Sequence, residues 1–323
     1  MRAASKLLGG AAGTAAGGSV DPTDVFAPVA YTGNGSTQSV TTGFDMSGEG
    51  GLTLIKTRNN AGGGEGVIID TVRGATKRLR PHSNDTENTD TDGLTAFTSS
   101  GFTLGNDSGY NYNTGTYISL NWLKKEAFFD VVAYSGTGSV QTVPHSLGAG
   151  SPPEMMWVKD RGRTKNWAVY HAGLGNTHLI YLNSTNAAAA DTLPWNNTSP
   201  TDSVFTVNTA GTVNSSSQNY IAYLFSSLAG VSKVGSAVHS GTTNVDAGFT
   251  NGSRFVMLKR TDAQGDWFIW NSTSGIVSGN DPYLLLNSTA AEVTNTDHID
   301  PYSSGFTITS NFTAGTYIYY AIA

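Results

Sequence analysis

The chain has 323 residues, no cysteine, a net charge of −6 and only 13% charged residues. The acidic balance excludes the basic surface of a nucleic-acid-binding protein, and the lack of cysteine excludes disulfides and thiolate zinc sites. The 39 glycines, together with abundant Ser, Thr and Asn, are typical of turn-rich all-β proteins. No apolar run is long enough to span a bilayer, so membrane insertion is not expected.

Residues 1–23 form a low-complexity Ala/Gly segment without an aromatic residue. Such a composition buries too little apolar surface to fold alone. Two interpretations stay open, a flexible tail and a docking arm that becomes ordered on a partner. A cleaved signal peptide is disfavoured, because the apolar stretch is limited to Leu7–Leu8 before glycines interrupt it.

One sequence pattern appears three times along the rest of the chain. It consists of a short, largely apolar run followed by a lysine, at Leu52–Arg58, Met155–Arg161 and Phe255–Thr261. The lysines Lys56, Lys159 and Lys259 are 103 and 100 residues apart. Self-similarity at a constant step is the signature of a repeat protein.

Further landmarks follow the same step and divide the chain into repeats. A Gly-Phe-Thr run recurs at Phe102 and Phe306 with its counterpart at Phe205, and an aromatic closing strand begins at Tyr117, Tyr220 and Tyr317. Short strands alternate with turn signals in each copy, a pattern typical of a β-sandwich or jelly roll. We therefore predict an all-β protein with three tandem β-sandwich repeats of about 100 residues, spanning residues 24–126, 127–230 and 231–323.

The lysine-terminated strands are apolar on both faces. Alternate side chains of a strand point to opposite sides, so a strand of this kind must be covered twice, by its facing sheet and by a loop, a neighbouring repeat or another subunit. We expect each lysine to mark the point where the strand emerges into water. The closing strand at Tyr317–Ile322 has the same character, and such faces favour a homo-oligomer, with a trimer preferred.

Candidate sites for chemistry are few. The six histidines do not recur at the repeat step, and no metal-binding or nucleophile motif is present, so no catalytic residue, cofactor or metal is expected. The acidic loop Asp85–Asp92 is the best cation candidate, although a solvated loop is the simpler interpretation. Trp195, with Asn196 and Asn197, is the candidate for glycan contact, because it is the tryptophan expected to be most exposed.

The repeat, with its apolar-Lys-x-Arg strand, its Leu-Asn-Ser-Thr loop (Leu182–Thr185, Leu286–Thr289) and its Tyr-Ile-Ala-Tyr closing strand, resembles an uncharacterised repeat domain of bacteriophage virion proteins. That domain is common in marine and cyanobacterial phages and is similar in places to concanavalin-like sandwiches. The first repeat departs from the pattern with Asn84-Asp85-Thr86 in place of Leu-Asn-Ser-Thr, and the third departs at His239–Thr243.

The resemblance implies a non-enzymatic structural protein on the surface of a phage particle. The leading expectation is a tail-fibre, fibre-adaptor or baseplate-peripheral component that takes part in host attachment, joined to other virion proteins through residues 1–23. Two alternatives stay open, a capsid decoration protein and a lectin-like module that binds a host-surface glycan. An enzyme that degrades polysaccharide is disfavoured, because no pair of carboxylates recurs in the repeats.

Overall fold

The computed structural model describes residues 20–323, and the predicted all-β sandwich fold is confirmed. Helical structure in this part of the chain is limited to two 3-10 turns, η1 (Pro22–Asp24) and η2 (Ala61–Gly63), and the four-residue helix α1 (Ser108–Asn111). Asp107 caps α1 by accepting a hydrogen bond from the main-chain N–H of Gly109. Most of the predicted docking arm, residues 1–19, lies outside the described residues.

The strands of the first unit lie between residues 26 and 123. They are β1 (Phe26–Thr32), β2 (Gln38–Thr41), β3 (Gly51–Thr57), β4 (Gly66–Asp70), β5 (Lys77–Arg78), β6 (Asn88–Thr89), β7 (Leu94–Thr98), β8 (Gly101–Leu104) and β9 (Thr116–Leu123). The large sheet has the order β1-β9-β3-β4, the facing sheet has the order β2-β8-β7, and β5 pairs with β6.

Two further units follow along the chain. The second contains β10 (Phe129–Ser135), β11 (Gln141–Pro144), β12 (Met155–Asp160), β13 (Ala168–His171), β14 (His178–Tyr181), β15 (Ala189–Ala190), β16 (Val204–Val207) and β17 (Asn219–Phe225). The third contains β18 (Ser232–His239), β19 (Thr243–Asp246), β20 (Phe255–Arg260), β21 (Trp267–Asn271), β22 (Leu284–Leu285), β23 (Ile299–Tyr302), β24 (Gly305–Ile308) and β25 (Gly315–Ile322). Every ladder within residues 20–323 pairs strands of a single unit.

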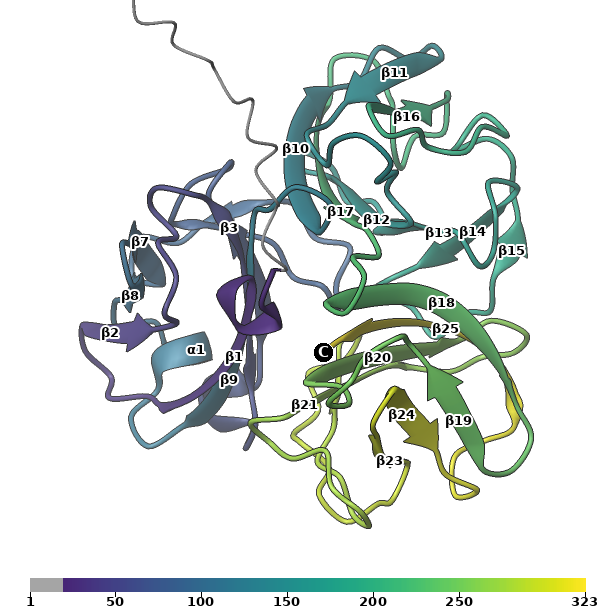
Figure 1. The fold of residues 1–323 in the computed structure, drawn as a ribbon. Coiled ribbons are helices and arrows are strands. Elements are labelled where there is room, and N and C mark those ends of the chain that lie inside the picture. Colours follow the sequence, from purple (N-terminus) through teal and green to yellow (C-terminus); the bar gives the residue numbers. More distant parts are fainter. Residues whose placement is uncertain (1–19) are drawn as a thin grey trace, which may run out of the picture.

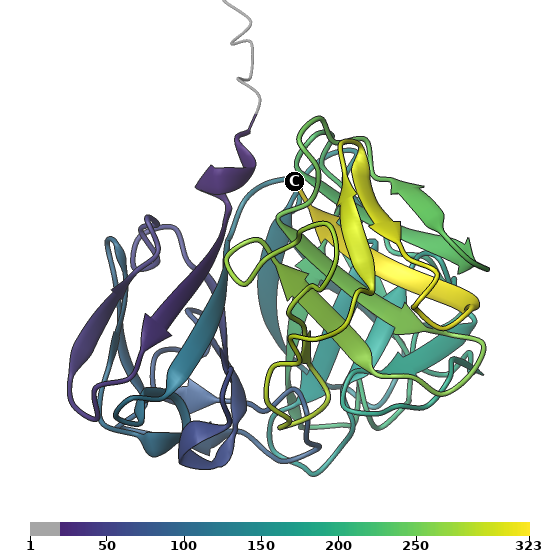
Figure 2. The same cartoon turned by 90° about the horizontal axis from the view of Figure 1, so that it is seen from below.

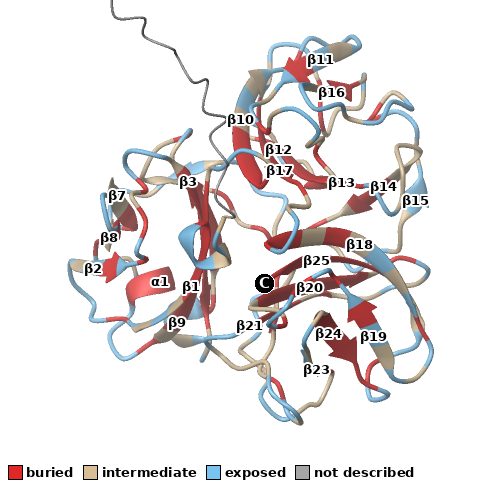
Figure 3. Ribbon diagram, viewed as in Figure 1, coloured by how far each residue is buried: buried red, intermediate tan, exposed pale blue. Residues whose placement is uncertain are grey.

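The three units surround a common centre, as Figure 1 shows. Each turns its large sheet inward, and the buried residues concentrate on those sheets, whereas the peripheral loops are exposed (Figure 3). In β17, Tyr223 and Phe225 face the centre of the molecule, while Ala222 and Leu224 face the second unit's own interior. The strands that are apolar on both faces are therefore covered on one side by their own sandwich and on the other by neighbouring units.

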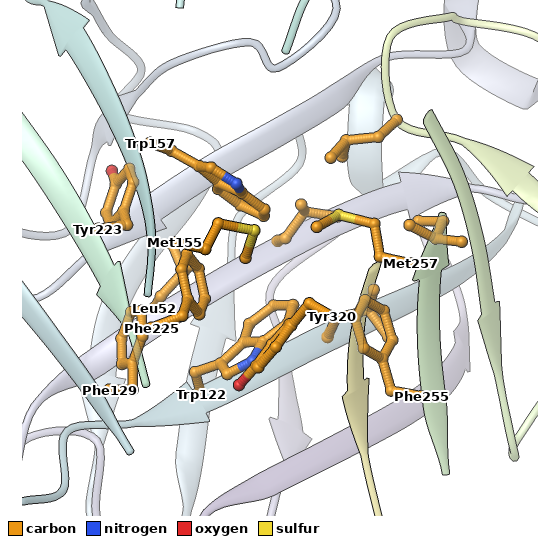
Figure 4. Close-up of a cluster of buried hydrophobic side chains, with 14 of the residues drawn as sticks. Leu52, Trp122, Phe129, Met155, Trp157, Tyr223, Phe225, Phe255, Met257 and Tyr320 are labelled. Atoms are coloured by element: carbon orange, nitrogen blue, oxygen red, sulfur yellow. The ribbon is translucent and has the colours of Figure 1, made fainter. Parts of the chain in front are cut away.

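The inward faces meet in one apolar cluster, which we call the central core. Figure 4 shows ten of its members, drawn from all three units: Leu52, Trp122, Phe129, Met155, Trp157, Tyr223, Phe225, Phe255, Met257 and Tyr320. Their rings make edge-on and tilted contacts, with centroids 5.6 Å apart for Trp122 and Phe255 and 5.1 Å apart for Phe225 and Tyr320. The surfaces that favoured a homotrimer are thus covered within one chain, and the trimer loses that support.

The prediction that the repeat lysines emerge into water is wrong. Lys56, Lys159 and Lys259 are fully buried. Because side chains alternate along a strand, each lysine shares the inward face with the apolar residue two positions before it. That face meets the next unit and not solvent, and burial lowers the pKa of each lysine to about 8.

The buried ammonium groups are hydrogen-bonded across the contacts between units, which we call seams. Each Nζ donates to a main-chain carbonyl oxygen in a loop of the neighbouring unit: Lys159 to Asn84 (3.3 Å), Lys259 to Ser184 (3.4 Å) and Lys56 to Ser288 (2.6 Å). These loops contain the Leu-Asn-Ser-Thr landmark or its counterpart at Asn84. The two strongest signatures of the repeat are therefore the two sides of one contact.

A second contact repeats at every seam. The main-chain N–H of Glu87, Ala188 and Glu292 donates to the carbonyl oxygen of Arg161 (2.8 Å), Thr261 (3.0 Å) and Arg58 (2.8 Å), respectively. The second unit contacts the first, the third contacts the second, and the first contacts the third. The chain thus closes into a ring with three equivalent seams, although the seam between the first and third units has no covalent link.

Candidate functional site

The predicted glycan-contact site is not an exposed aromatic platform. The side chain of Trp195 is buried, and its Nε1 donates to the carbonyl oxygen of His178 (3.1 Å). Asn196 and Asn197 follow in left-handed backbone conformations, and Asn197 is exposed. The expectation that Trp195 is the most exposed tryptophan is therefore wrong, since the loop folds back and inserts the indole into the second unit's core.

Two acids of the loop Asp85–Asp92, Glu87 and Asp90, pair with arginines. Glu87 accepts two hydrogen bonds from Arg161 across a seam (2.8 and 2.9 Å) and lies 3.3 Å from Nη1 of Arg73. Asp90 pairs with Arg78 at 3.0 Å. Within residues 20–323, no three His, Asp or Glu side chains are grouped so as to hold a metal ion.

A further group of charged side chains in the first unit surrounds Arg78, and we call it the Arg78 cluster. It comprises Glu65, Arg78, Asp90, Asp107 and Tyr110. Nη1 of Arg78 lies 3.0 Å from Asp90, 3.3 Å from Glu65 and 3.7 Å from Asp107. The hydroxyl of Tyr110 donates to Asp90. One guanidinium thus joins four separate segments, namely the loop before β4, strand β5, the loop after β6 and helix α1.

Burial and mutual repulsion set the protonation of this cluster. Burial, and then the charge of Asp90, raises the pKa of the Asp107 carboxyl group. Burial together with the hydrogen bond to Asp90 raises the pKa of Tyr110. The carboxylates are neutralised mainly by Arg78, with Arg80 adding a 2.7 Å ion pair to Glu65.

The second unit has apolar residues at the corresponding places. Ile180 pairs with Val169 in the second unit as Leu79 pairs with Ile68 in the first, so Leu179 occupies the place of Arg78. Val213 occupies the place of Tyr110, since each precedes the first tyrosine of its closing strand by seven residues. Both Leu179 and Val213 belong to the apolar interior of the second unit. Replacing apolar residues by half-buried ion pairs rarely adds stability. The corresponding positions of the second unit are apolar, so this group of charges in the first unit is a candidate functional feature.

The Arg78 cluster does not stand out in the sequence of the first repeat. The signal that could reveal it is the comparison of repeats: Arg78 aligns with Leu179 when β4 is superposed on β13, and Tyr110 aligns with Val213 when β9 is superposed on β17. The cluster can hold loops in place by ion pairing, while Arg78 occupies the space that a cation or cofactor would need among the carboxylates. No helix of residues 20–323 is long and apolar enough to cross a membrane.

Comparison with known proteins identifies a family without assigning a role. The family described as "Domain of unknown function (DUF7483)" matches residues 21–323, which is nearly the whole chain. No curated protein matches the chain.

Proposed function

The chain belongs to the DUF7483 family, and from its own architecture we propose that it is a structural protein of a bacteriophage particle, exposed on the particle surface. Its role is that of a tail-fibre, fibre-adaptor or baseplate-peripheral component in host attachment. It acts without catalysis, as a rigid head that other virion proteins hold through residues 1–23.

One observation carries the proposal, which is the closure of three sandwiches into a ring around a single core. Both faces of the large sheets are used for packing, the repeat lysines are used in the seams, and Glu87 and Asp90 of the acidic loop are used in ion pairs. The features that recur in the repeats of this chain thus serve rigidity. A rigid, mostly uncharged body suits an exposed structural element, and the resemblance noted in the sequence points to virions.

The positions of the two described ends of the chain also support a rigid body that is attached to the particle from one side. Val20 packs against the central core, and the main-chain N–H of Ala323 donates to Val231 (2.9 Å). Figure 2 shows η1, the first described element, on the side of the molecule where the chain ends. The opposite side, which holds the lysine ends of β3, β12 and β20, is then free to face outward.

Localisation on the particle tests the proposal. Antibody labelling followed by cryo-electron microscopy of phage particles that contain the protein should place it at the tail or baseplate, in a few dozen copies or fewer. Hundreds of copies on the head would instead support the capsid decoration alternative. Absence of the protein from purified particles would refute a virion role.

Competition for host cells tests the attachment role. The purified full chain, added in excess, should slow phage adsorption by occupying the receptor. Unchanged adsorption kinetics would refute the role in attachment but not the structural role. Light scattering of the same preparation tests homo-oligomerisation through surfaces other than the central core, and a monomer would remove the trimer from the proposal.

A further inference from the structure

A polar groove lies beside the Arg78 cluster on the first unit. Its volume is about 410 Å³, within the range of small-ligand sites. Three segments form its walls: the turn after β1, the loop between β6 and β7 together with the start of β7, and the loop between β8 and α1. The residues of this unit-1 groove are Gly35, Ser36, Thr37, Thr91, Asp92, Thr95, Gly105 and Asn106.

The walls present unused hydrogen-bonding groups. Ser36, Thr37, Thr91, Asp92 and Asn106 are all exposed, and within residues 20–323 none of these five side chains forms a hydrogen bond or an ion pair. Hydroxyl, amide and carboxylate groups therefore line the groove together with glycine main chain. No large apolar or aromatic side chain is among the lining residues, so a ligand must be recognised by hydrogen bonds and not by apolar burial.

The walls are fixed relative to one another by buried polar contacts. The fully buried Asn111 donates through Nδ2 to the carbonyl oxygens of Ser36 (2.6 Å) and Gly105, and its Oδ1 accepts from the main-chain N–H of Asn34 (3.0 Å). Two main-chain bonds join the other walls, from Asp107 to Asp92 (2.9 Å) and from Gly105 to Gly93 (2.7 Å). A groove held in this way loses little conformational entropy when a ligand binds.

The Arg78 cluster supports the same walls from behind. Asp90 belongs to the loop between β6 and β7, and Asp107 belongs to the loop between β8 and α1. Nη1 of Arg78 lies 3.0 Å from the carboxylate of Asp90 and 3.7 Å from that of Asp107, so it links these two walls. In the second unit the corresponding interior is apolar. The charges of the Arg78 cluster thus hold the two loops that form most of the groove, which gives them a positioning role.

The charge around the groove restricts the ligand. Asp92 is on the wall, and Asp90 and Asp107 stand directly behind it, with Arg78 as their shared cation. An anionic ligand would meet carboxylate before it met guanidinium, so sulfated or carboxylated ligands are disfavoured. Vicinal hydroxyls that donate to Asp92 and accept from Asn106 fit the inventory of donors and acceptors best.

We propose that the unit-1 groove binds a neutral saccharide, of mono- or disaccharide size, through hydrogen bonds with the side chains of Ser36, Thr37, Thr91, Asp92 and Asn106. This inference names what the proposed attachment protein recognises and therefore rests on the proposed function. It moves the glycan contact from Trp195 in the second unit to a groove on the first.

A binding experiment on the purified full chain tests the site. The probes are immobilised neutral hexose and N-acetylhexosamine mono- and disaccharides, with their sulfated counterparts as the charged comparison. At least one neutral probe should bind, and the double variant Asp92→Ala/Asn106→Ala should weaken that binding about tenfold or more. The control variant Glu126→Ala/Asn295→Ala, which also removes one exposed acid and one exposed amide, should bind as the unchanged chain does.

Three outcomes would overturn the proposal. They are the absence of binding to every neutral probe at roughly 10 mM, equal or tighter binding of the sulfated probes, and unchanged binding in the groove variant. Thermal melting of both variants shows whether they are folded, and Asn106→Ala alone serves if the double variant melts early. Because the assay needs no particle, a saccharide-binding protein that is absent from virions would refute the proposed function and leave the groove intact.

Discussion

Trp195 closes the interior of the second unit from a loop. Its ring lies edge-on to Tyr170, with centroids 5.8 Å apart, and the Nε1 hydrogen bond to His178 satisfies its one polar atom. Nothing in the run Leu193-Pro194-Trp195-Asn196-Asn197 reveals this, because the residues around the tryptophan are those of an exposed turn. The direction of the side chain is set by the distant strands that provide its pocket, and a local pattern does not contain that information.

Replacing Trp195 by alanine should therefore destabilise the protein. The change removes a fully buried aromatic side chain, and the expected loss is about 3–5 kcal/mol in the free energy of unfolding. Urea denaturation followed by fluorescence or circular dichroism measures this loss. Leu193→Ala is the matched control, since Leu193 is 53% exposed in the same loop and its replacement should change the free energy by less than about 0.5 kcal/mol. Equal stabilities of the two variants would contradict a core role for Trp195.

Strand β25 is the element on which the third unit depends. It lies between β18 and β20 and pairs with both along nearly its whole length. Its alternate side chains enter two cores, with Ile318, Tyr320 and Ile322 in the central core and Tyr317, Tyr319 and Ala321 in the third unit's interior. The strand therefore links the folding of the third unit to the packing of the whole ring.

Deleting the last six residues should unfold the third unit. The truncation strips hydrogen bonds from both neighbouring strands and leaves both cores open, and no other strand is placed to substitute. Circular dichroism melting and limited proteolysis should show loss of cooperativity and cleavage between β18 and β24. Removal of Ala323 alone, which costs one main-chain bond to Val231, should leave the melt nearly unchanged. A normal melt of the longer deletion would show this account of β25 to be mistaken.

At the scale of single elements, the sequence predicts the strands well where apolar residues recur in a regular local pattern. The lysine-terminated runs predicted at Leu52–Arg58, Met155–Arg161 and Phe255–Thr261 coincide with β3, β12 and β20 to within a residue at each end. Helix α1 has only four residues, which is too short for a helical period of apolar residues to appear in the sequence. Its first turn is instead capped by the carboxylate of Asp107.

At the scale of the whole molecule, the ring could not be predicted from the pattern alone. A strand that is apolar on both faces requires a second cover, but the sequence does not say whether a loop, a repeat or a subunit supplies it. The expectation for the lysines fails for the same reason, since a lysine at the end of an apolar strand normally reaches water. Here the neighbouring unit supplies carbonyl oxygens at the point where solvent was expected.

The three seam lysines should make the stability of the ring depend on alkaline pH. Their folded pKa is about 8, whereas an unfolded lysine titrates near 10.4. Between these values the unfolded chain binds more protons, so the free energy of unfolding rises with pH. The neutral amine still carries hydrogens to donate to the seam carbonyls, so loss of the charge removes a burial cost without breaking the contact.

The free energy of unfolding, measured by urea denaturation at pH 8, 9 and 10, should therefore increase with a slope of the order of 1 kcal/mol per lysine per pH unit. The urea midpoint should rise with it. The increase should end above about pH 10. Burial raises the folded pKa of Tyr31, Tyr134 and Tyr223. Above pH 10 these tyrosines therefore ionise in the unfolded chain but not in the folded protein, which lowers the free energy of unfolding. Replacing Lys159 by methionine should remove roughly a third of the slope, and Lys125→Met, at an exposed position, should leave it unchanged. A midpoint that falls steadily from pH 8 would mean that the seam lysines keep their charge without cost, and that the loop carbonyls compensate fully for burial of the ammonium groups.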